Sequence, residues 1–531
     1  MALNKKNKRI GNKRKAQDNP FLESQKIASQ FDEATLKQDV DKLRELILSI
    51  EKDLDDKDIF FKAQMYYSLA TATDTVSRLS DNDVEKRKRK FLQEVKMSKE
   101  KPTKKQLYYY RESLKIIKTE EFNIPKYMAH TRSLQACLLT NYGNTLRECG
   151  RVISAIEQYK DALGYYPFFP MAMGNLGCCY MQYAYLLGYT QEFYRDCLNR
   201  HSYLLLNDAL ESKDPNIYIE GKAYFASQLS RFHIDYREFL SNPIAYDELK
   251  IKTKKENEYR QWVLDNNLFL SPLNDLIDKN ISFAKDTIGI NRMLTSVEET
   301  IPVVFGMFNQ LKQEYISARF LLYESIAVNG KVHFSDFNTN LTETLEYAQF
   351  SLRVEKLKIA FKTIYGILDK IAYFLNVYYD LGIPERSVNY RSVWRDETNG
   401  KKHKNVLNID ENFALASLYW ICQDFDETFG KDSNPGLERL RKIRNFLEHK
   451  YTIVTWFYND KKPLKEHVEA LYISENELYE CTIELFKVVR EAVICLALCV
   501  NVEEDKKIDK LSDETKVVNM TISKFDDEFK F

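Results

Sequence analysis

The sequence predicts an all-α protein, and three observations support that prediction. Glycine and proline are scarce, with 16 Gly and 12 Pro in 531 residues, which favours long helices over many short strands. Hydrophobic residues make up 44% of the chain, enough to fill large cores. They recur at helical spacing in the longer segments. The length predicts roughly two or three domains.

The charge balance restricts the possible functions. Lys+Arg and Asp+Glu both number 78, so the formal net charge is zero. This excludes a protein that coats nucleic acid through bulk positive charge, and any RNA contact must be a local patch. The longest apolar run, Ala492 to Val500, is too short to span a bilayer, and no apolar core follows the first basic residues. We expect no membrane association, and we interpret the nine cysteines as reduced thiols of a cytoplasmic protein.

The N-terminal half contains a repeat. Asn175-Leu176-Gly177 follows Asn141-Tyr142-Gly143 by 34 residues. Gly143 is expected where two helices cross closely, Ala155 and Ala162 are expected as small packing positions, and Tyr159 is expected to fill the gap between them. The period and the small-residue pattern resemble the tetratricopeptide (TPR) repeat. Since roughly three repeats are needed to bury a continuous core, we expect a TPR-like helical solenoid over residues 25–245, with an unknown protein or peptide trigger on its concave face.

A second helical region is expected over residues 300–502. Its segments with helical periodicity are 308–325, 343–379, 413–425, 435–451 and 475–500. Together they predict a helical bundle. The ranges outside the two helical regions are a flexible basic tail at 1–20, a linker or docking segment at 246–299, and a flexible acidic tail at 503–531.

The helix expected over residues 435–451 carries the most informative side chains. At about 100° per residue its apolar positions gather on one side: Leu437, Leu440, Ile443 and Leu447. The polar positions on the opposite arc are Arg441, Asn445, Glu448 and His449. Arg444 lies about 140° around the helix from His449, so these two side chains meet poorly within one regular helix.

Arg444 and His449 are the side chain types that metal-independent cleavage of an RNA phosphodiester requires. Arginine binds phosphate as a fork, and histidine titrates near neutral pH. The structural alternative is an exposed helix end, in which Arg444 forms an i,i+4 ion pair with Glu448. The residues by themselves leave both interpretations open.

The run Arg444-Asn445-Phe446-Leu447-Glu448-His449, in a helical bundle after TPR-like repeats, resembles the R-N-x-x-x-H motif of the HEPN superfamily (higher eukaryotes and prokaryotes nucleotide-binding). Many active HEPN proteins are metal-independent endoribonucleases of toxin–antitoxin, CRISPR and anti-phage systems. The resemblance covers residues 300–502. It implies a HEPN-type helical bundle, RNA as the substrate, no cofactor and no metal. It also implies a homodimer in which the motifs of two chains meet across a shared cleft.

The resemblance further implies roles for the motif residues. His449 would deprotonate the ribose 2′-OH or protonate the leaving 5′-oxygen. Arg444 would stabilise the charge that grows on the phosphate oxygens, and Asn445 would orient the phosphate or the base.

Further residues are expected to support the site. Some HEPN nucleases use an acidic residue from an earlier helix, and Asp369 is the candidate, although it could instead pair with Lys370. Glu448 would orient His449 unless it forms the ion pair described above. The residues expected to contact RNA are Lys450, Tyr451 and Arg441.

Other chemistries have little support in the sequence. Cys178-Cys179 and the spaced pair Cys495 and Cys499 have no partners at zinc spacing, so we interpret them as buried thiols. The acidic residues Asp424, Asp426 and Glu427 are expected in a loop and also lack metal-ligand spacing. No phosphate-binding loop or nucleophile-elbow motif occurs.

Two functional hypotheses follow. The first is a HEPN-type endoribonuclease that cleaves RNA by 2′-OH attack, with the TPR-like region sensing a trigger in antiviral defence or toxin-like growth arrest. The second is a non-catalytic HEPN and TPR scaffold that binds RNA, a nucleotide or protein partners.

Overall fold

The fold is taken from a computed structural model. It describes residues 21–87, 92–123, 125–188, 191–215, 217–232, 246, 248–296, 301–326, 332–343, 345, 347–394, 407–425, 435–456, 470–512, 515, 517–518 and 520–530. The basic tail predicted at residues 1–20 lies outside these ranges, as do Asp426 and Glu427 of the acidic cluster.

The N-terminal part is a stack of helices. They are α2 (Leu22–Leu36), α3 (Val40–Asp53), α4 (Ile59–Arg87), α5 (Leu92–Ile117), α6 (Met128–Glu148), α7 (Val152–Tyr165), α8 (Pro170–Leu187), α9 (Glu192–Glu211) and α10 (Ile219–Leu229). The strongest packing joins α4 with α5, α6 with α7, and α8 with α9. This pairing of sequence neighbours is consistent with the predicted TPR-like repeats.

The predicted close crossing at Gly143 is observed. A Cβ atom on Gly143 would lie 2.7 Å from Cε1 of Tyr159, and Tyr159 is fully buried. The helices α6 and α7 therefore approach through a glycine on one and an aromatic ring on the other. Cys178 and Cys179, predicted as buried thiols, are buried on α8.

The C-terminal part is a bundle with a small sheet. Its helices are α12 (Lys254–Asp265), α13 (Val303–Ile326), α14 (Leu352–Tyr378), α15 (Phe413–Asp424), α16 (Pro435–His449) and α17 (Glu475–Asp509). The strands β1 (Tyr451–Thr455) and β2 (Ala470–Ser474) pair in parallel. The protein is thus all-α apart from this short sheet in the part of the chain that the structure describes.

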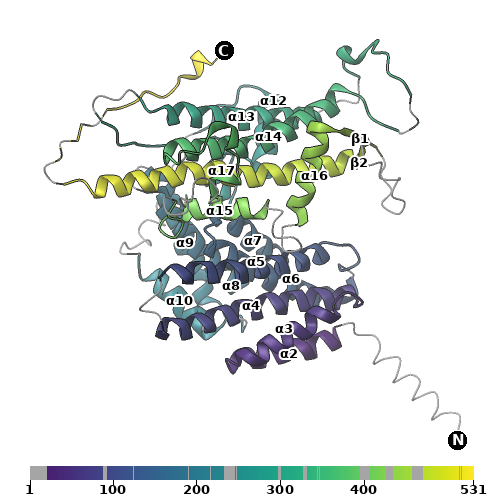
Figure 1. The fold of residues 1–531 in the computed structure, drawn as a ribbon, viewed down its shortest axis with the longest axis vertical. Helices are drawn as coiled ribbons and strands as arrows, with labels where there is room; N and C mark the ends of the chain where they lie inside the picture. The colour runs from purple at the N-terminus through teal and green to yellow at the C-terminus, as the bar shows by residue number, and fades with distance from the viewer. Residues whose placement is uncertain are drawn as a thin grey trace, which may run out of the picture.

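Helix α17 is the central element of the bundle. Every residue from Val489 to Asn501 is buried, which explains why the run from Ala492 to Val500 is apolar all round; the buried charges of Arg490 and Glu491 are paired with Asp275 and Arg151. In Figure 1 it crosses the molecule beneath α13 and α14, and α15 lies between it and the N-terminal helices. The N-terminal stack and the C-terminal bundle are therefore layered along the long axis of the molecule.

Two predicted boundaries were wrong. Helix α17 continues to Asp509, because Glu504 is fully buried and accepts a hydrogen bond of 2.7 Å from the Tyr378 hydroxyl. The predicted acidic tail at 503–531 therefore begins as ordered helix. The motif helix ends at His449, and Tyr451 starts β1. The run Tyr-Thr-Ile-Val-Thr is rich in β-branched residues that favour a strand.

The turn between α6 and α7 touches the C-terminal bundle at a glycine. Gly150 has φ 79°, and a Cβ atom there would lie 2.2 Å from the carbonyl oxygen of Phe413, the first residue of α15. Any larger residue would be strained in its backbone and would push the two layers apart.

Gly150→Ala should lower the free energy of unfolding by about 2–4 kcal/mol, because it combines a left-handed backbone penalty with a clash. Urea unfolding measures this. Gly366→Ala is the matched control, since a Cβ atom on Gly366 within α14 has open space around it. That variant should be stabilised by roughly 0.5–1 kcal/mol through helix propensity. Equal stability of Gly150→Ala and the unmodified protein would contradict the interpretation of the turn.

Candidate functional site

The motif helix α16 lies against α14 and runs into β1. Its apolar face is buried as predicted, with Leu437, Leu440 and Ile443 no more than 1% exposed. Leu447 is half-buried. This packing fixes the rotation of the helix, so the polar positions point away from the core.

Arg444 is half-buried and directed at α14. Its guanidinium carbon lies 5.6 Å from the centre of the Tyr365 ring, a cation–π contact. Its Nη1 donates a hydrogen bond of 3.2 Å to Oδ1 of Asn445. Asn445 is itself exposed, so within one chain it holds the arginine at the surface of the helix.

The structural alternative included an ion pair between Arg444 and Glu448, and that ion pair is not formed. Among the described residues no ion pair joins Arg444 to Glu448, and Glu448 is exposed. The physical reason is that the guanidinium is held by the Tyr365 ring and the Asn445 amide, which direct it toward α14.

Four charged side chains act on Tyr365. Burial raises the pKa of its hydroxyl; Arg444 opposes that shift, Asp369 adds to it, and Arg441 and Arg391 oppose it. Two residues from the predicted set, Asp369 and Arg441, are therefore brought into the neighbourhood of Arg444. Arg391, Arg441 and Arg444 thus lie within electrostatic range of one ring, together with the carboxylate of Asp369, and we call these three arginines the arginine patch.

Asp369 has a structural contact of its own. Its Oδ1 accepts a hydrogen bond of 3.2 Å from the backbone N–H of Tyr390. Tyr390 is buried and donates from its hydroxyl to the carbonyl oxygen of Leu418 on α15, at 2.9 Å. Lys370, the partner considered for Asp369, forms an ion pair with Glu314 instead. Asp369 thus anchors the segment that presents Arg391.

His449 lies at the other end of the motif. It is the last residue of α16 and is exposed, together with Lys450 and Tyr451. The ammonium of Lys450 lies 4.8 Å from the centre of the Phe446 ring. Because α16 is regular up to His449, the offset of about 140° from Arg444 persists. Within one chain the imidazole and the guanidinium face different directions.

The sequence did not point to Tyr365 or Arg391. Tyr365 lies within an apolar helical run, where an aromatic residue is ordinary core, and Arg391 follows that helix in an irregular segment. Neither has a fixed spacing to Arg444 along the chain. Only the packing of α14 against α16 brings them to the motif.

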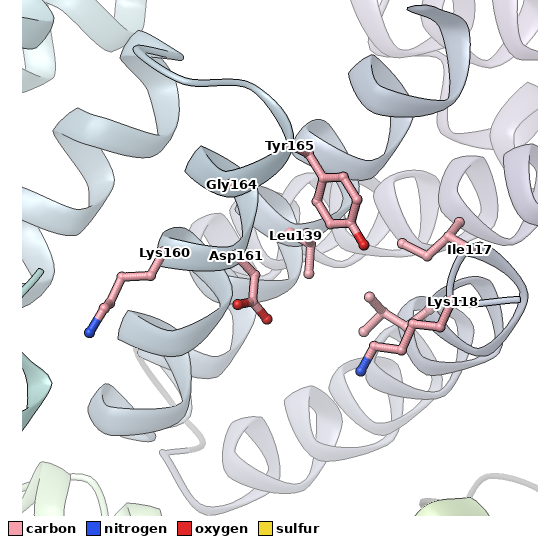
Figure 2. Close-up of a pocket in the computed structure, with 8 residues that line it drawn as sticks. Ile117, Lys118, Leu139, Lys160, Asp161, Gly164 and Tyr165 are labelled. Atoms are coloured by element: carbon pink, nitrogen blue, oxygen red, sulfur yellow. The ribbon is translucent and has the colours of Figure 1, made fainter. Parts of the chain in front are cut away.

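A separate cavity lies in the N-terminal stack. Its volume is about 350 Å³, and it is lined by Leu114, Ile117, Lys118, Leu139, Lys160, Asp161, Gly164 and Tyr165. Figure 2 shows the carboxylate of Asp161 and the amine of Lys118 facing the same space, with the Tyr165 hydroxyl above them. None of the lining residues comes from the C-terminal bundle, so this cavity is distinct from the motif.

Asp161 should make stability depend on pH. Partial desolvation by the surrounding helices and the neighbouring Glu157 raise the pKa of Asp161 to about 6, although its side chain is still exposed, so its ionised form is disfavoured in the folded state. The folded protein therefore loses stability as pH rises from about 4 to about 6, and the loss persists above that range. Asp161→Asn should add about 1 kcal/mol at about pH 7, after solvent screening, and almost nothing at about pH 4. Urea unfolding at both pH values measures this, and equal effects would contradict it.

The structure also bears on other classes of site. In the described ranges, no group of three or more His, Cys, Asp or Glu side chains could hold a metal ion. No helix that the structure describes is long and apolar enough to cross a membrane.

Asp424, predicted in an acidic loop, is the last residue of α15 and is only 5% exposed. It is buried because two arginines of the N-terminal stack pair with it.

Comparison with known families gave one match. Residues 295–503 match the family described as LA2681-like HEPN. The matched range begins before α13 and includes α14, α15, α16, the two strands and most of α17. No curated protein and no solved structure matches the chain.

Proposed function

We propose that residues 295–503, which match the LA2681-like HEPN family, form a metal-independent endoribonuclease domain. The observation that carries the proposal is the surface of α16. It combines a guanidinium held over Tyr365, inside a patch of three arginines, with an exposed imidazole at the helix end. The patch suits an RNA phosphate, and the imidazole suits proton transfer near neutral pH.

In the proposed reaction the ribose 2′-OH attacks the adjacent phosphorus. The bond from O2′ to phosphorus forms and the bond from phosphorus to O5′ breaks, leaving a 2′,3′-cyclic phosphate and a 5′-OH. His449 accepts the 2′ proton or delivers a proton to O5′. Arg444 stabilises the charge on the non-bridging oxygens, and Asn445 holds Arg444 in place. Lys450, Tyr451 and Arg441 extend the RNA contact surface.

The site is proposed to be completed by a second copy of the chain. One α16 directs Arg444 toward α14 and leaves His449 about 140° away, so a single phosphate is not reached by both. A homodimer that brings two such helices together places Arg444 of one copy near His449 of the other.

The N-terminal stack is proposed to sense a trigger. Its cavity offers an apolar wall, Leu114, Ile117 and Leu139, beside the opposed charges of Lys118 and Asp161. A protein or peptide segment with an apolar side chain and a neighbouring charge fits this chemistry. A nuclease that acts on general RNA must be kept inactive until a trigger is present, and the N-terminal stack would supply that control. The inferred role of the protein is antiviral defence or toxin-like growth arrest.

One observation favours a second candidate, a non-catalytic scaffold. In the single chain His449 does not contact Arg444, and the arginine patch by itself would bind RNA or a nucleotide without cleaving it.

One assay distinguishes the endoribonuclease from the non-catalytic scaffold. Purified full-length protein is incubated with RNA in EDTA, and the ends of any fragments are analysed. Cleavage in EDTA that leaves 2′,3′-cyclic phosphate and 5′-OH ends supports the enzyme. RNA binding without cleavage, with and without added divalent metal, supports the scaffold.

A further inference from the structure

A continuous series of contacts connects the N-terminal stack to Arg444. It begins at two buried arginines of the N-terminal stack and passes through Asp424, the last residue of α15, and Phe425, which follows it. It ends at the aromatic ring beneath the Arg444 guanidinium. Each contact is short and most of its members are buried.

The first contacts are ionic. Asp424 is only 5% exposed and accepts from Arg111 Nη2 at 2.8 Å and from Arg151 Nη1 at 2.6 Å. Arg151 also pairs with Glu491 of α17 at 2.8 Å, and Glu491 accepts from Ser154 Oγ at 2.6 Å. Buried charges of this kind are held in one geometry, because any displacement leaves a charge uncompensated.

The adjoining residue continues the series. Phe425 follows Asp424 directly, is buried, and meets the ring of Tyr365 edge-on with centroids 5.9 Å apart. Tyr365 in turn lies 5.6 Å from the Arg444 guanidinium carbon. Phe425 therefore supports one edge of the ring on which the motif arginine rests.

We propose that Asp424 and Phe425 are positioning residues through which the N-terminal stack holds Arg444 in its working orientation. A shift of the stack would move Asp424 first, because both its partner arginines belong to that stack. Phe425 would follow, since it is the next residue, and the Tyr365 ring would lose its support. The effect on RNA cleavage rests on the proposed function, whereas the mechanical coupling does not.

The test uses two variants of the full chain with matched controls. Phe425→Leu removes the ring that supports Tyr365, and Phe374→Leu makes the same change at another buried site, 0% exposed against 8% for Phe425, where the ring stacks on Tyr378 instead. Asp424→Asn weakens the ionic contacts, and Asp275→Asn does the same at the buried pair of Asp275 with Arg490, 2.8 Å apart. Phe425→Leu keeps the test decisive if Asp424→Asn does not fold.

The first readout is hydrogen exchange of the amides in α16, which needs no enzymatic activity. Coupling predicts exchange several-fold faster in Phe425→Leu and Asp424→Asn than in their controls, after correction for global stability. Exchange in α16 equal to that of the controls would overturn the proposal.

The second readout is RNA cleavage. Phe425→Leu should lower kcat by about tenfold and change KM by less than about twofold, because a misplaced Arg444 weakens the transition state more than RNA binding. A parallel loss in Phe374→Leu would assign the effect to general destabilisation and overturn the proposal. If the unmodified protein does not cleave RNA, the proposed function fails while the exchange data still decide the coupling.

Discussion

Arg444→Ala is expected to lower kcat for RNA cleavage by about 10²–10³-fold, the usual cost of removing one preorganised donor to a developing oxyanion. Arg444→Lys should recover little, because an ammonium can reproduce neither the fork on phosphate nor the flat contact with Tyr365. His449→Ala should also lower kcat, by about 10²–10⁴-fold, through loss of proton transfer. Single-turnover cleavage of a labelled RNA measures all three.

Arg439→Ala is the control on the same helix. Arg439 forms an ion pair with Glu477 and is 52% exposed, so its loss should leave kcat within about twofold and the fold intact. A large fall in this variant, or cleavage that survives in both Arg444→Ala and His449→Ala, would remove α16 from the active site.

Mixing the two inactive variants tests whether the site is shared between copies. In a mixed dimer one chain supplies Arg444 and its partner supplies His449, so one complete site is restored. Recovery to about a quarter of normal activity is expected, since about half the dimers are mixed and each has one of two possible sites. Mass measurement in solution should show the dimer. No recovery, or an active enzyme that is strictly monomeric, would contradict a shared site.

Arg151→Ala is expected to produce the largest loss of stability, about 3–5 kcal/mol in the free energy of unfolding. Burial works against the charge of Arg151, but Glu491 and Asp424 raise its pKa, so it is ionised and fully engaged. Its removal leaves the carboxylate of Glu491, only 1% exposed, without its cation at the contact between the two layers. Denaturant unfolding followed by circular dichroism measures the change.

Arg44→Ala is the control for the stability loss expected in Arg151→Ala. Arg44 also pairs with an aspartate, Asp41, but that pair is exposed on the surface of α3. Its loss should cost no more than about 1 kcal/mol. If the two variants were equally stable, the buried ionic cluster would not hold the N-terminal stack to the bundle.

Much of the fold was predictable because it depends on local periodicity. The buried face of α16, the close crossing of Gly143 with Tyr159 and the buried cysteines all follow from spacing along one helix or between neighbours. The predicted C-terminal ends of α16 and α17 were wrong for different reasons. The acidic end of α17 was predicted to be mobile because the sequence does not show that Glu504 is buried against Tyr378. The short strand β1 was not predicted because it directly follows a segment with a stronger helical pattern.

The sequence by itself determined the chemistry that α16 can present. An arginine, an amide and a histidine stand at fixed angles on one helix, and helix geometry alone sets the offset of about 140° between Arg444 and His449. It also determined the two helical regions, because their apolar periods are continuous.

The tertiary structure alone decided what surrounds Arg444. Tyr365 contacts it through the packing of α14 against α16, Asp369 and Arg391 lie within electrostatic range of that ring, and Asp424 lies 313 residues from its partner Arg111. Contacts between distant segments depend on which faces pack together, and no spacing along the chain encodes that choice. For that reason Asp424 looked like part of a solvated acidic loop in the sequence. In the structure it is a buried anion that joins the N-terminal stack to the motif.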